Sequence, residues 1–195
     1  MKQIFLSASV PERGRGQFDE TSNPFLIQFA VRELITLCLG RRRVIWGGHP
    51  SITPMVHAVC QDFGMSFDAP VLLYQSTYFA DQFPASNQFF DPILVEACSS
   101  KADSLTALRF HMLNQPIDAA VFIGGMEGIF EEYELFRKLH GPDATVLALR
   151  APGGAARDLA SMLLPEDTDD RIDFARLLQE GLRIDPAELR ELVKQ

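Results

Sequence analysis

Five short apolar runs, each bounded by turn residues, alternate along this chain with segments of helical periodicity. The runs cover residues 3–7, 43–46, 70–74, 119–123 and 145–149. The helical segments cover roughly residues 24–38, 53–63, 104–113 and 129–139. Short continuous apolar runs are typical of strands buried on both faces, and strands that alternate with helices pair in parallel. The alternation therefore predicts an α/β fold, a doubly wound parallel sheet with helices on both faces.

The chain is long enough for one buried core, since 47% of its 195 residues are hydrophobic. We predict a single domain over residues 1–195. Two parts stand outside the alternation, a Phe-rich insertion at about residues 75–95 and a helical C-terminal tail from about residue 155. The insertion is too long for a plain connection and is interpreted as a lid or a dimer contact, and the tail as a cover for the sheet or for a partner subunit. The tail contains an acidic cluster and two amphipathic segments, at residues 166–170, 172–182 and 186–193.

The charge balance excludes several partners. With 18 basic and 26 acidic side chains the net charge is −8, which works against binding to nucleic-acid phosphates or to anionic membranes. The apolar stretch at residues 25–39 is interrupted by charges and is too short to span a membrane. We therefore expect a cytoplasmic protein with no nucleic-acid and no membrane partner. The four histidines show no metal-ligand spacing, so we expect no metal and no cofactor. The three cysteines are interpreted as reduced core thiols: Cys38, Cys60 and Cys98.

A glycine-rich loop, GGMEGIFEE, follows the run at 119–123 and opens the next helical segment. In a doubly wound sheet, ligands bind beyond the carboxyl ends of the strands, where the strand order reverses. Glycines let the backbone approach a ligand, and the amides at a helix N-terminus attract an anion such as phosphate. A glycine turn also arises wherever a positive φ is needed, so the loop alone is weak support. Its candidate ligand-binding residues are Gly124, Gly125, Met126, Glu127, Gly128, Ile129 and Glu131.

Two ionisable residues, Arg109 and Glu132, fall on the apolar sides of their predicted helices. Glu132 has mainly apolar neighbours three and four residues away, and Arg109 interrupts the apolar stripe of its helix. A charge against apolar surface is costly unless it is paired, protonated or in contact with a ligand. The alternatives are a helix-dipole role for the glutamate and an arginine that extends to solvent. We predict that the two residues face each other across a pocket, and they are the candidate catalytic residues.

Two more loops reach the same edge of the sheet. The first run ends in small residues, and the loop after residue 46 reads GGHPSITPMV. Ser51 and Thr53 in this loop either bind a phosphate or cap the next helix, and His49 lies beside them. Arg13 and Arg15 either bind a phosphate or belong to a solvated charged loop, which is the favoured interpretation. The candidate ligand-binding residues of these loops are Ser7, Ala8, Ser9, Gly47, Gly48, Ser51 and Thr53.

These loops resemble those of the SLOG superfamily, a group of Rossmann-like domains that includes the lonely-guy phosphoribohydrolases and nucleotide-sensing domains. The family pattern PGGxGTxEE is similar to GGMEGIFEE here, with Glu131 and Glu132 at the paired acids. At the family's spacing, its catalytic arginine falls on Arg109 and its aspartate before the core strand falls on Asp118. The resemblance covers residues 2 to about 149. It implies a Rossmann-like fold, a phosphate-binding loop, a nucleotide-type small-molecule partner and a homodimer.

The chain also departs from the hydrolases of this family. Met126 and Ile129 replace a glycine and a threonine of the pattern, and the third glycine of the earlier loop is absent at residues 49–54. The phosphate loop is therefore bulkier and less polar than that of the hydrolases. The runs FLSAS and IGGMEGIFEEYELF are more similar to the sensing branch.

Two functions fit the same predicted pocket. The favoured one is binding or sensing of a nucleotide or an NAD-derived ligand at the C-terminal edge of the sheet. The alternative is lonely-guy-like hydrolysis of the N-glycosidic bond of nucleoside 5′-monophosphates, with Arg109 and Glu132 as the catalytic pair. A Rossmann-like scaffold with a non-functional pocket is the third possibility.

Overall fold

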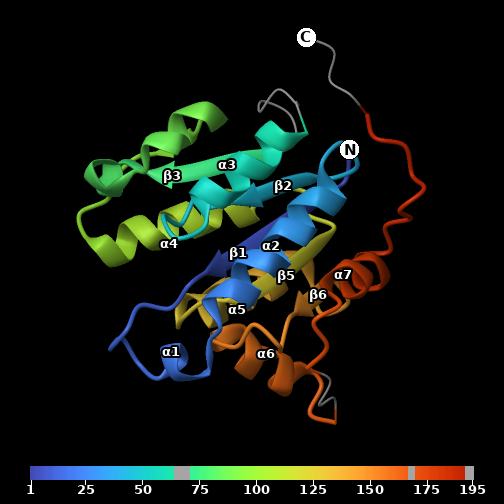
Figure 1. Cartoon of the computed structure of the whole chain (residues 1–195). Coiled ribbons are helices and arrows are strands. Elements are labelled where there is room, and N and C mark those ends of the chain that lie inside the picture. The colour runs from blue at the N-terminus through green and yellow to red at the C-terminus, as the bar shows by residue number, and fades with distance from the viewer. Residues whose placement is uncertain (64–70, 167–169, 192–195) are drawn as a thin grey trace.

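The computed structural model describes residues 1–63, 71–166 and 170–191. Within these residues, six strands form one parallel sheet in the order β4-β3-β2-β1-β5-β6. The strand order reverses between β1 and β5, because the chain adds strands on one side of β1 before it returns to the other side (Figure 1). The strands are β1 (Gln3–Ser9), β2 (Arg43–Trp46), β3 (Val71–Ser76), β4 (Ile93–Val95), β5 (Ala119–Gly124) and β6 (Thr145–Ala148).

Helices cover both faces of this sheet (Figure 1). One face carries α2 (Pro24–Cys38), α3 (Thr53–Asp62) and α7 (Phe174–Leu182). The other carries α4 (Lys101–Leu113), α5 (Gly128–His140) and α6 (Ala155–Leu163). A short helix, α1 (Phe18–Thr21), precedes α2. Among the described residues, no helix combines the length and the apolar character that crossing a membrane requires.

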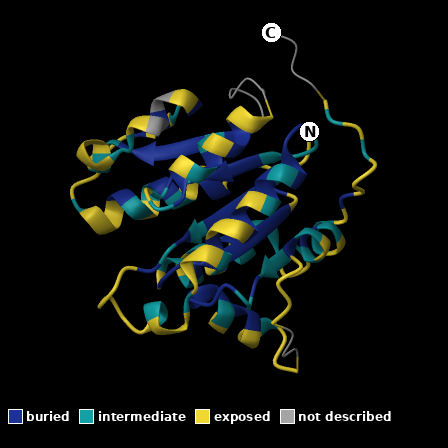
Figure 2. Cartoon of the chain, in the orientation of Figure 1, coloured by how far each residue is buried: buried dark blue, intermediate teal, exposed yellow. Residues whose placement is uncertain are grey.

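Strands β1, β2, β3 and β5 are largely buried between the two helical layers, which explains why their sequences are mainly apolar. Along β1, Ile4 and Leu6 belong to the core beneath α2, whereas Phe5 belongs to the core beneath α4 and α5. Figure 2 shows the central strands largely in the buried colour, β6 in the intermediate colour and the outer surface of α2 largely exposed. Cys38 and Cys60 are buried, but Cys98 is exposed, so the prediction of a core thiol is wrong for Cys98. That residue lies in the connection after β4 and not in a strand or helix.

The α/β fold predicted from the sequence is confirmed, with its parallel sheet and its helices on both faces. The run at 70–74 corresponds to β3, which continues to Ser76; Pro70 lies outside the described residues. The prediction missed β4, because this strand is only three residues long and two of them, Ile93 and Leu94, are exposed. The helix expected from residue 104 starts at Lys101, where the Ser100 side chain accepts a hydrogen bond from the Asp103 amide.

The Phe-rich insertion has a structure of its own. It contains the end of β3, two 3₁₀-helices and β4; the helices are η1 (Thr77–Gln82) and η2 (Ala85–Phe90). The ring of Phe90 packs edge-on against Trp46 of β2, with 6.4 Å between the ring centroids. The end of the insertion is therefore anchored in the core of the domain.

The tail contains α6 and α7 and then loses helical structure. Residues 186–191, the described part of the amphipathic segment at 186–193, form turns and irregular backbone. Instead, the Glu191 amide donates to the carbonyl of Gly40, and the Arg190 side chain donates to the carbonyl of Thr36. This end of the tail covers the C-terminal end of α2. Residues 192–193, and residues 167–169 of the acidic cluster, lie outside the described residues.

Candidate functional site

A cavity of about 600 Å³ lies at the carboxyl ends of β1, β2 and β3, beside the start of α5. Its position next to the reversal of strand order is the one expected for a ligand site in a doubly wound sheet. The structure brings many of the sequence-predicted residues together here: Ser7, Ala8, Ser9, Gly47, Gly48, Ser51, Arg109, Met126, Glu127, Gly128, Ile129 and Glu132 line the cavity. The other predicted residues are outside its lining: Thr53, Gly124, Gly125 and Glu131.

Glu132 is held by one residue from β1 and one from α4. The Ser7 hydroxyl donates a hydrogen bond to Oε2 of Glu132, across 125 positions of the sequence. Arg109 Nε lies 3.4 Å from the other oxygen, Oε1. The same guanidinium group also forms an ion pair with the exposed Glu131. The sequence prediction that Arg109 and Glu132 face each other matches this geometry.

Burial controls the protonation of this carboxyl group. Only 17% of the Glu132 side chain and 13% of the Arg109 side chain are exposed. Loss of solvent raises the pKa of Glu132 above its ordinary value, while the hydrogen bond from Ser7 and the charge of Arg109 act in the lowering direction. Burial dominates, so Glu132 is a carboxyl group that takes up a proton more readily than a solvated glutamate does.

The glycine loop owes its shape to residues that no larger side chain can replace. Gly124 and Gly125 both have positive φ angles, +65° and +74°. A Cβ at Gly124 would lie 2.7 Å from the Ser9 carbonyl oxygen, and one at Gly125 would lie 2.5 Å from the Ile129 side chain. These two glycines shape the loop and do not line the cavity.

The loop is also fastened from behind by the start of α6. The Ala155 amide donates to the Gly125 carbonyl at 3.0 Å. Gly154 packs so closely against the loop that a Cβ there would lie 2.8 Å from the Gly124 carbonyl carbon. The loop is thereby fixed from the side opposite to the cavity.

The backbone amides at the start of α5 belong to residues that line the cavity. Met126, Glu127 and Gly128 line the cavity, and their amides have no hydrogen-bond acceptor among the described residues. Amides at a helix N-terminus carry the positive end of the helix dipole. This part of the wall is suited to an anionic group on a ligand.

The loop between β2 and α3 is fixed mainly by its own hydrogen bonds. The Thr53 hydroxyl donates to the His49 carbonyl, so Thr53 is neither the cap of α3, whose N-cap is Ile52 without a side-chain cap bond, nor part of the cavity lining. Ser51 Oγ accepts from the Val10 amide and lies 2.8 Å from Nδ1 of His49. His49 lines the cavity, and burial lowers the pKa of its imidazole. This histidine therefore favours its neutral form.

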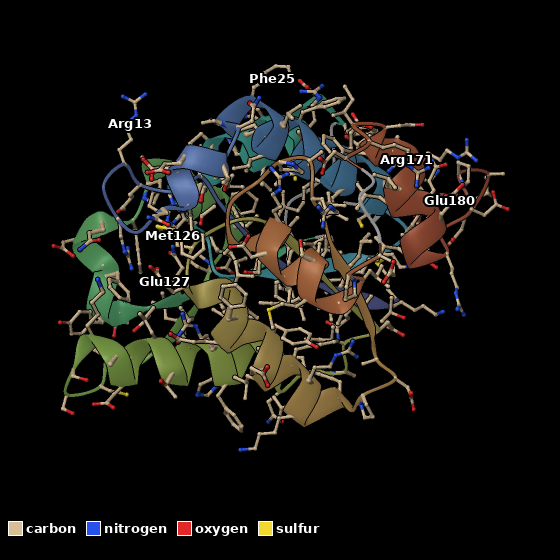
Figure 3. The ribbon with its side chains drawn as sticks, turned by 90° about the horizontal axis from the view of Figure 1, so that it is seen from below. Arg13, Phe25, Met126, Glu127, Arg171 and Glu180 are labelled. Atoms are coloured by element: carbon tan, nitrogen blue, oxygen red, sulfur yellow. The ribbon has the colours of Figure 1, made fainter. Side chains whose placement is uncertain are left out.

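Charges of both signs line the cavity. The acidic members are Glu12, Glu127 and Glu132, and the basic members are Arg15, Lys101 and Arg109. Arg13 is not among them, and Figure 3 shows its side chain pointing away from the molecule, whereas Met126 and Glu127 lie between α5 and the loop that follows β1. A Cβ on Gly16 of that loop would lie 3.3 Å from Oε1 of Glu127. The carboxylate of Glu127 thus lies at the boundary between the free amides and the loop after β1.

A comparison with protein families identifies the group to which these loops belong. The model of the SLOG cluster3 family matches residues 17–182, which include α5, the glycine loop and Arg109. The chain belongs to the SLOG cluster3 family. Membership of a SLOG family supports a nucleotide-related function in general. None of the curated proteins with which the sequence was compared matches it significantly.

Comparison with solved structures supports the fold of this SLOG domain. The crystal structure of the structural-genomics target TM1055 is similar, with a TM-score of 0.60 and 19% sequence identity. The alignment covers 94% of this chain and 98% of TM1055. At this identity the likeness concerns the Rossmann-like fold alone.

Several residues of the SLOG cavity were missed by the sequence analysis. Gln75 and Ser76 line it from the end of β3, and Phe79 and Phe83 line it from the insertion. Lys101 lines it from the first turn of α4. Gln75 directly follows the predicted strand at 70–74, and the strand-end rule that selected Ser7 would have selected it. The Phe-rich insertion was interpreted from the sequence as a lid or a dimer contact, without residues assigned to the site, and the structure places its Phe79 and Phe83 in the cavity lining.

Among the described residues of this SLOG domain, metal-ligating side chains do not gather at one place. Within the described ranges, no group of three or more His, Cys, Asp or Glu side chains is placed to hold a metal ion. Asp118, which the resemblance singled out, accepts a hydrogen bond from the Gln3 amide at 2.8 Å. It connects the start of β5 to the start of β1, at the opposite end of the strands from the cavity.

Proposed function

We propose that this SLOG domain binds a nucleotide or an NAD-derived nucleotide in the cavity at the C-terminal edge of its sheet. The observation that carries the proposal is the set of free amides at Met126, Glu127 and Gly128, which open into the cavity beside Arg109 and Glu132. A volume of about 600 Å³ lies within the range of small-molecule sites, about 300–1,000 Å³.

The cavity offers a suitable group for each part of such a ligand. The α5 amides receive the phosphate, and the cations Arg109 and Lys101 balance its charge. Glu132 accepts hydrogen bonds from ribose hydroxyls, because it lines the cavity and its carboxylate already accepts from the Ser7 hydroxyl there. The net charge of the chain is −8, so attraction of an anion depends on these local groups and not on the charge of the whole domain.

Thermal unfolding with a ligand panel tests the proposal. AMP, ADP-ribose and NAD at millimolar concentration are each added to the purified chain, and at least one is expected to raise Tm. Arg109→Ala is expected to remove the shift. Arg176→Ala is the matched control, because Arg176 also pairs with a glutamate but lies exposed in α7. An unchanged Tm with all three nucleotides would overturn the proposal.

A second candidate function rests on the protonation of Glu132. A buried carboxyl group with a raised pKa is suited to proton transfer near neutral pH. In hydrolysis of a nucleoside 5′-monophosphate, the bond between C1′ and the base nitrogen breaks and water adds to C1′. Glu132 takes one proton of that water and passes it to the nitrogen of the departing base, so the hydroxyl group stays on C1′ and the carboxylate is regenerated.

Chromatography distinguishes the two functions. The protein is incubated with nucleoside 5′-monophosphates, and free base is measured over time. Base release that is lost in Glu132→Ala establishes the hydrolase. Tm shifts without base release leave binding as the function of the site.

A further inference from the structure

Two side chains at the β2–β3 side of the cavity each contain a buried polar atom that has no hydrogen-bond partner among the described residues. Oε1 of Gln75 and Nε1 of Trp46 are inaccessible to solvent and accept or donate no hydrogen bond within the described residues. The exposed fractions are 3% for Gln75 and 2% for Trp46, and both residues line the cavity. A buried polar group without a partner is rare, because it loses its hydrogen bonds to water and gains none in return.

Gly48 makes the room that the Gln75 carboxamide occupies. A Cβ at position 48 would lie 3.1 Å from Nε2 of Gln75. Gly48 also has a φ angle of +70°, which a residue with a side chain rarely adopts. A side chain at position 48 would therefore crowd both the carboxamide of Gln75 and the side chain of Leu73, which a Cβ would meet at 2.4 Å.

The neighbouring wall is aromatic. Phe79 of η1 and Phe83, which follows η1, line the same cavity as Gln75. An amide next to aromatic surface is typical of sites for planar heterocycles, because the rings stack while the amide bonds the edge. The α5 amides are on the other side of the site, since β5 and β3 are separated by three strand spacings, about 14 Å.

We propose that Gln75 recognises the base of the bound nucleotide and that this base is adenine, with Phe79 and Phe83 covering the face of the ring. This inference rests on the proposed function. A carboxamide presents one donor beside one acceptor, and glutamine pairs in this way with the amino group and the adjacent ring nitrogen of adenine. The phosphate then lies at α5 and the ribose beside Glu132, so the ligand spans the cavity from β5 to β3.

Calorimetric titration with three probes tests the base subsite. The probes are AMP, IMP and ribose 5-phosphate, which all keep the phosphate. The base of AMP carries an amino group, the base of IMP carries a carbonyl in its place, and ribose 5-phosphate has no base. The wild-type chain is expected to bind AMP at least tenfold more tightly than either of the others. Equal affinities for AMP and ribose 5-phosphate would overturn the base subsite and leave nucleotide binding intact; no binding of any probe or of NAD overturns both.

A substitution tests the residue itself. Gln75→Leu keeps the size of the side chain and removes its donor and acceptor, so AMP affinity is expected to fall at least tenfold while ribose 5-phosphate affinity stays the same. Gln61→Leu, an exposed position near the end of α3, is the matched control. Unchanged AMP affinity in Gln75→Leu overturns the role of Gln75. If this variant does not fold, adenine recognition is tested by the affinities of the wild-type chain for AMP and IMP. Equal affinities for these two nucleotides overturn adenine recognition.

Discussion

Gly128 and Arg109 are in such close contact that a methyl group at position 128 would lie 2.8 Å from Nη2 of the guanidinium group. The φ angle of Gly128 is not positive, so the backbone itself accepts an alanine. The absent side chain therefore matters for the position of Arg109 and not for the turn. The glycine that begins α5 is thereby linked directly to the charged pair of the cavity.

Gly128→Ala is predicted to weaken nucleotide binding with little change in stability. The added methyl group displaces Arg109 from Glu132, and we expect about a tenfold rise in the Kd of AMP, which corresponds to about 1.4 kcal/mol. The free energy of unfolding is expected to stay within about 0.5 kcal/mol of wild type. Calorimetry and urea unfolding measure the two effects. Gly181→Ala in α7 is the control, since its Cβ meets only the Leu147 side chain; equal Kd values for both variants would contradict the prediction.

Arg109→Ala is predicted to destabilise the protein even without ligand. It leaves the Glu132 carboxylate buried without its cation, which we expect to cost about 1–3 kcal/mol at neutral pH. The double variant Arg109→Ala/Glu132→Gln removes the stranded charge and is expected to recover part of this loss. Urea unfolding of the wild type, both single variants and the double variant provides the measurement. Strict additivity of the two substitutions would show that the residues do not interact.

The stability of the protein is predicted to fall as pH rises through the titration of Glu132. Burial raises the pKa of Glu132 in the folded state, whereas a glutamate in the unfolded chain has a pKa of about 4.3. The folded chain therefore holds this proton at pH values where the unfolded chain has lost it. The contribution is fully present below pH of about 4 and is lost as pH rises through the folded pKa.

Glu132→Gln cannot titrate at this position, so its stability relative to wild type is expected to increase from pH 4 to pH 8. The increase amounts to about 1.4 kcal/mol for each unit by which the folded pKa is raised. Urea unfolding across this range measures it. A difference between the two proteins that is constant with pH would show that the pKa of Glu132 is not raised.

Glu127→Gln is predicted to strengthen the binding of phosphate-bearing ligands. Its carboxylate lies beside the free amides of the α5 N-terminus, where it repels a second anion. We expect a Kd for AMP that is lower by a factor of about three to ten at low ionic strength, with the gain reduced in high salt. Glu134→Gln makes the same charge change on the exposed side of α5 and serves as the control. An equal gain in both variants would assign the effect to net charge alone.

A thiol reagent is predicted to modify one cysteine rapidly in the folded protein. Burial raises the pKa of both Cys38 and Cys60 to about 12, so their reactive thiolates are scarce at pH 8, whereas Cys98 is exposed. Spectrophotometric titration is expected to show one fast thiol in buffer and three in guanidinium chloride. The fast phase is expected to disappear in Cys98→Ser, and its persistence would place reactivity at a buried cysteine.

Much of the fold follows from the sequence because burial leaves a strong pattern. The strands β1, β2 and β5 are short, largely buried and flanked by turns, and helices α2 and α5 begin and end close to their predicted limits. The pattern fails where burial is weak. Strand β4 pairs with the edge of the sheet and exposes Ile93 and Leu94, so its sequence resembles that of a loop.

The candidate site was predictable on one side only. Ser7, Glu132 and Arg109 follow from strand ends and from charges on apolar helix faces, which are local features. Gln75 was within reach of the same strand-end rule, whereas Phe79 required knowledge of how the insertion returns over the strand ends, which depends on tertiary packing such as the contact between Phe90 and Trp46. The sequence also left the role of Thr53 undecided, because capping and ligand binding use the same hydroxyl.

The attachment of the glycine loop to α6 extends the contacts of the loop beyond the cavity. The Gly125 carbonyl is bonded to the first residue of α6, and just before that helix the Pro152 carbonyl accepts from Asn23, the N-cap of α2. These two backbone hydrogen bonds connect the glycine loop to the start of α6 and, through Pro152, to the start of α2. The loop is thereby linked to helices on both faces of the sheet, because α6 lies on one face and α2 on the other.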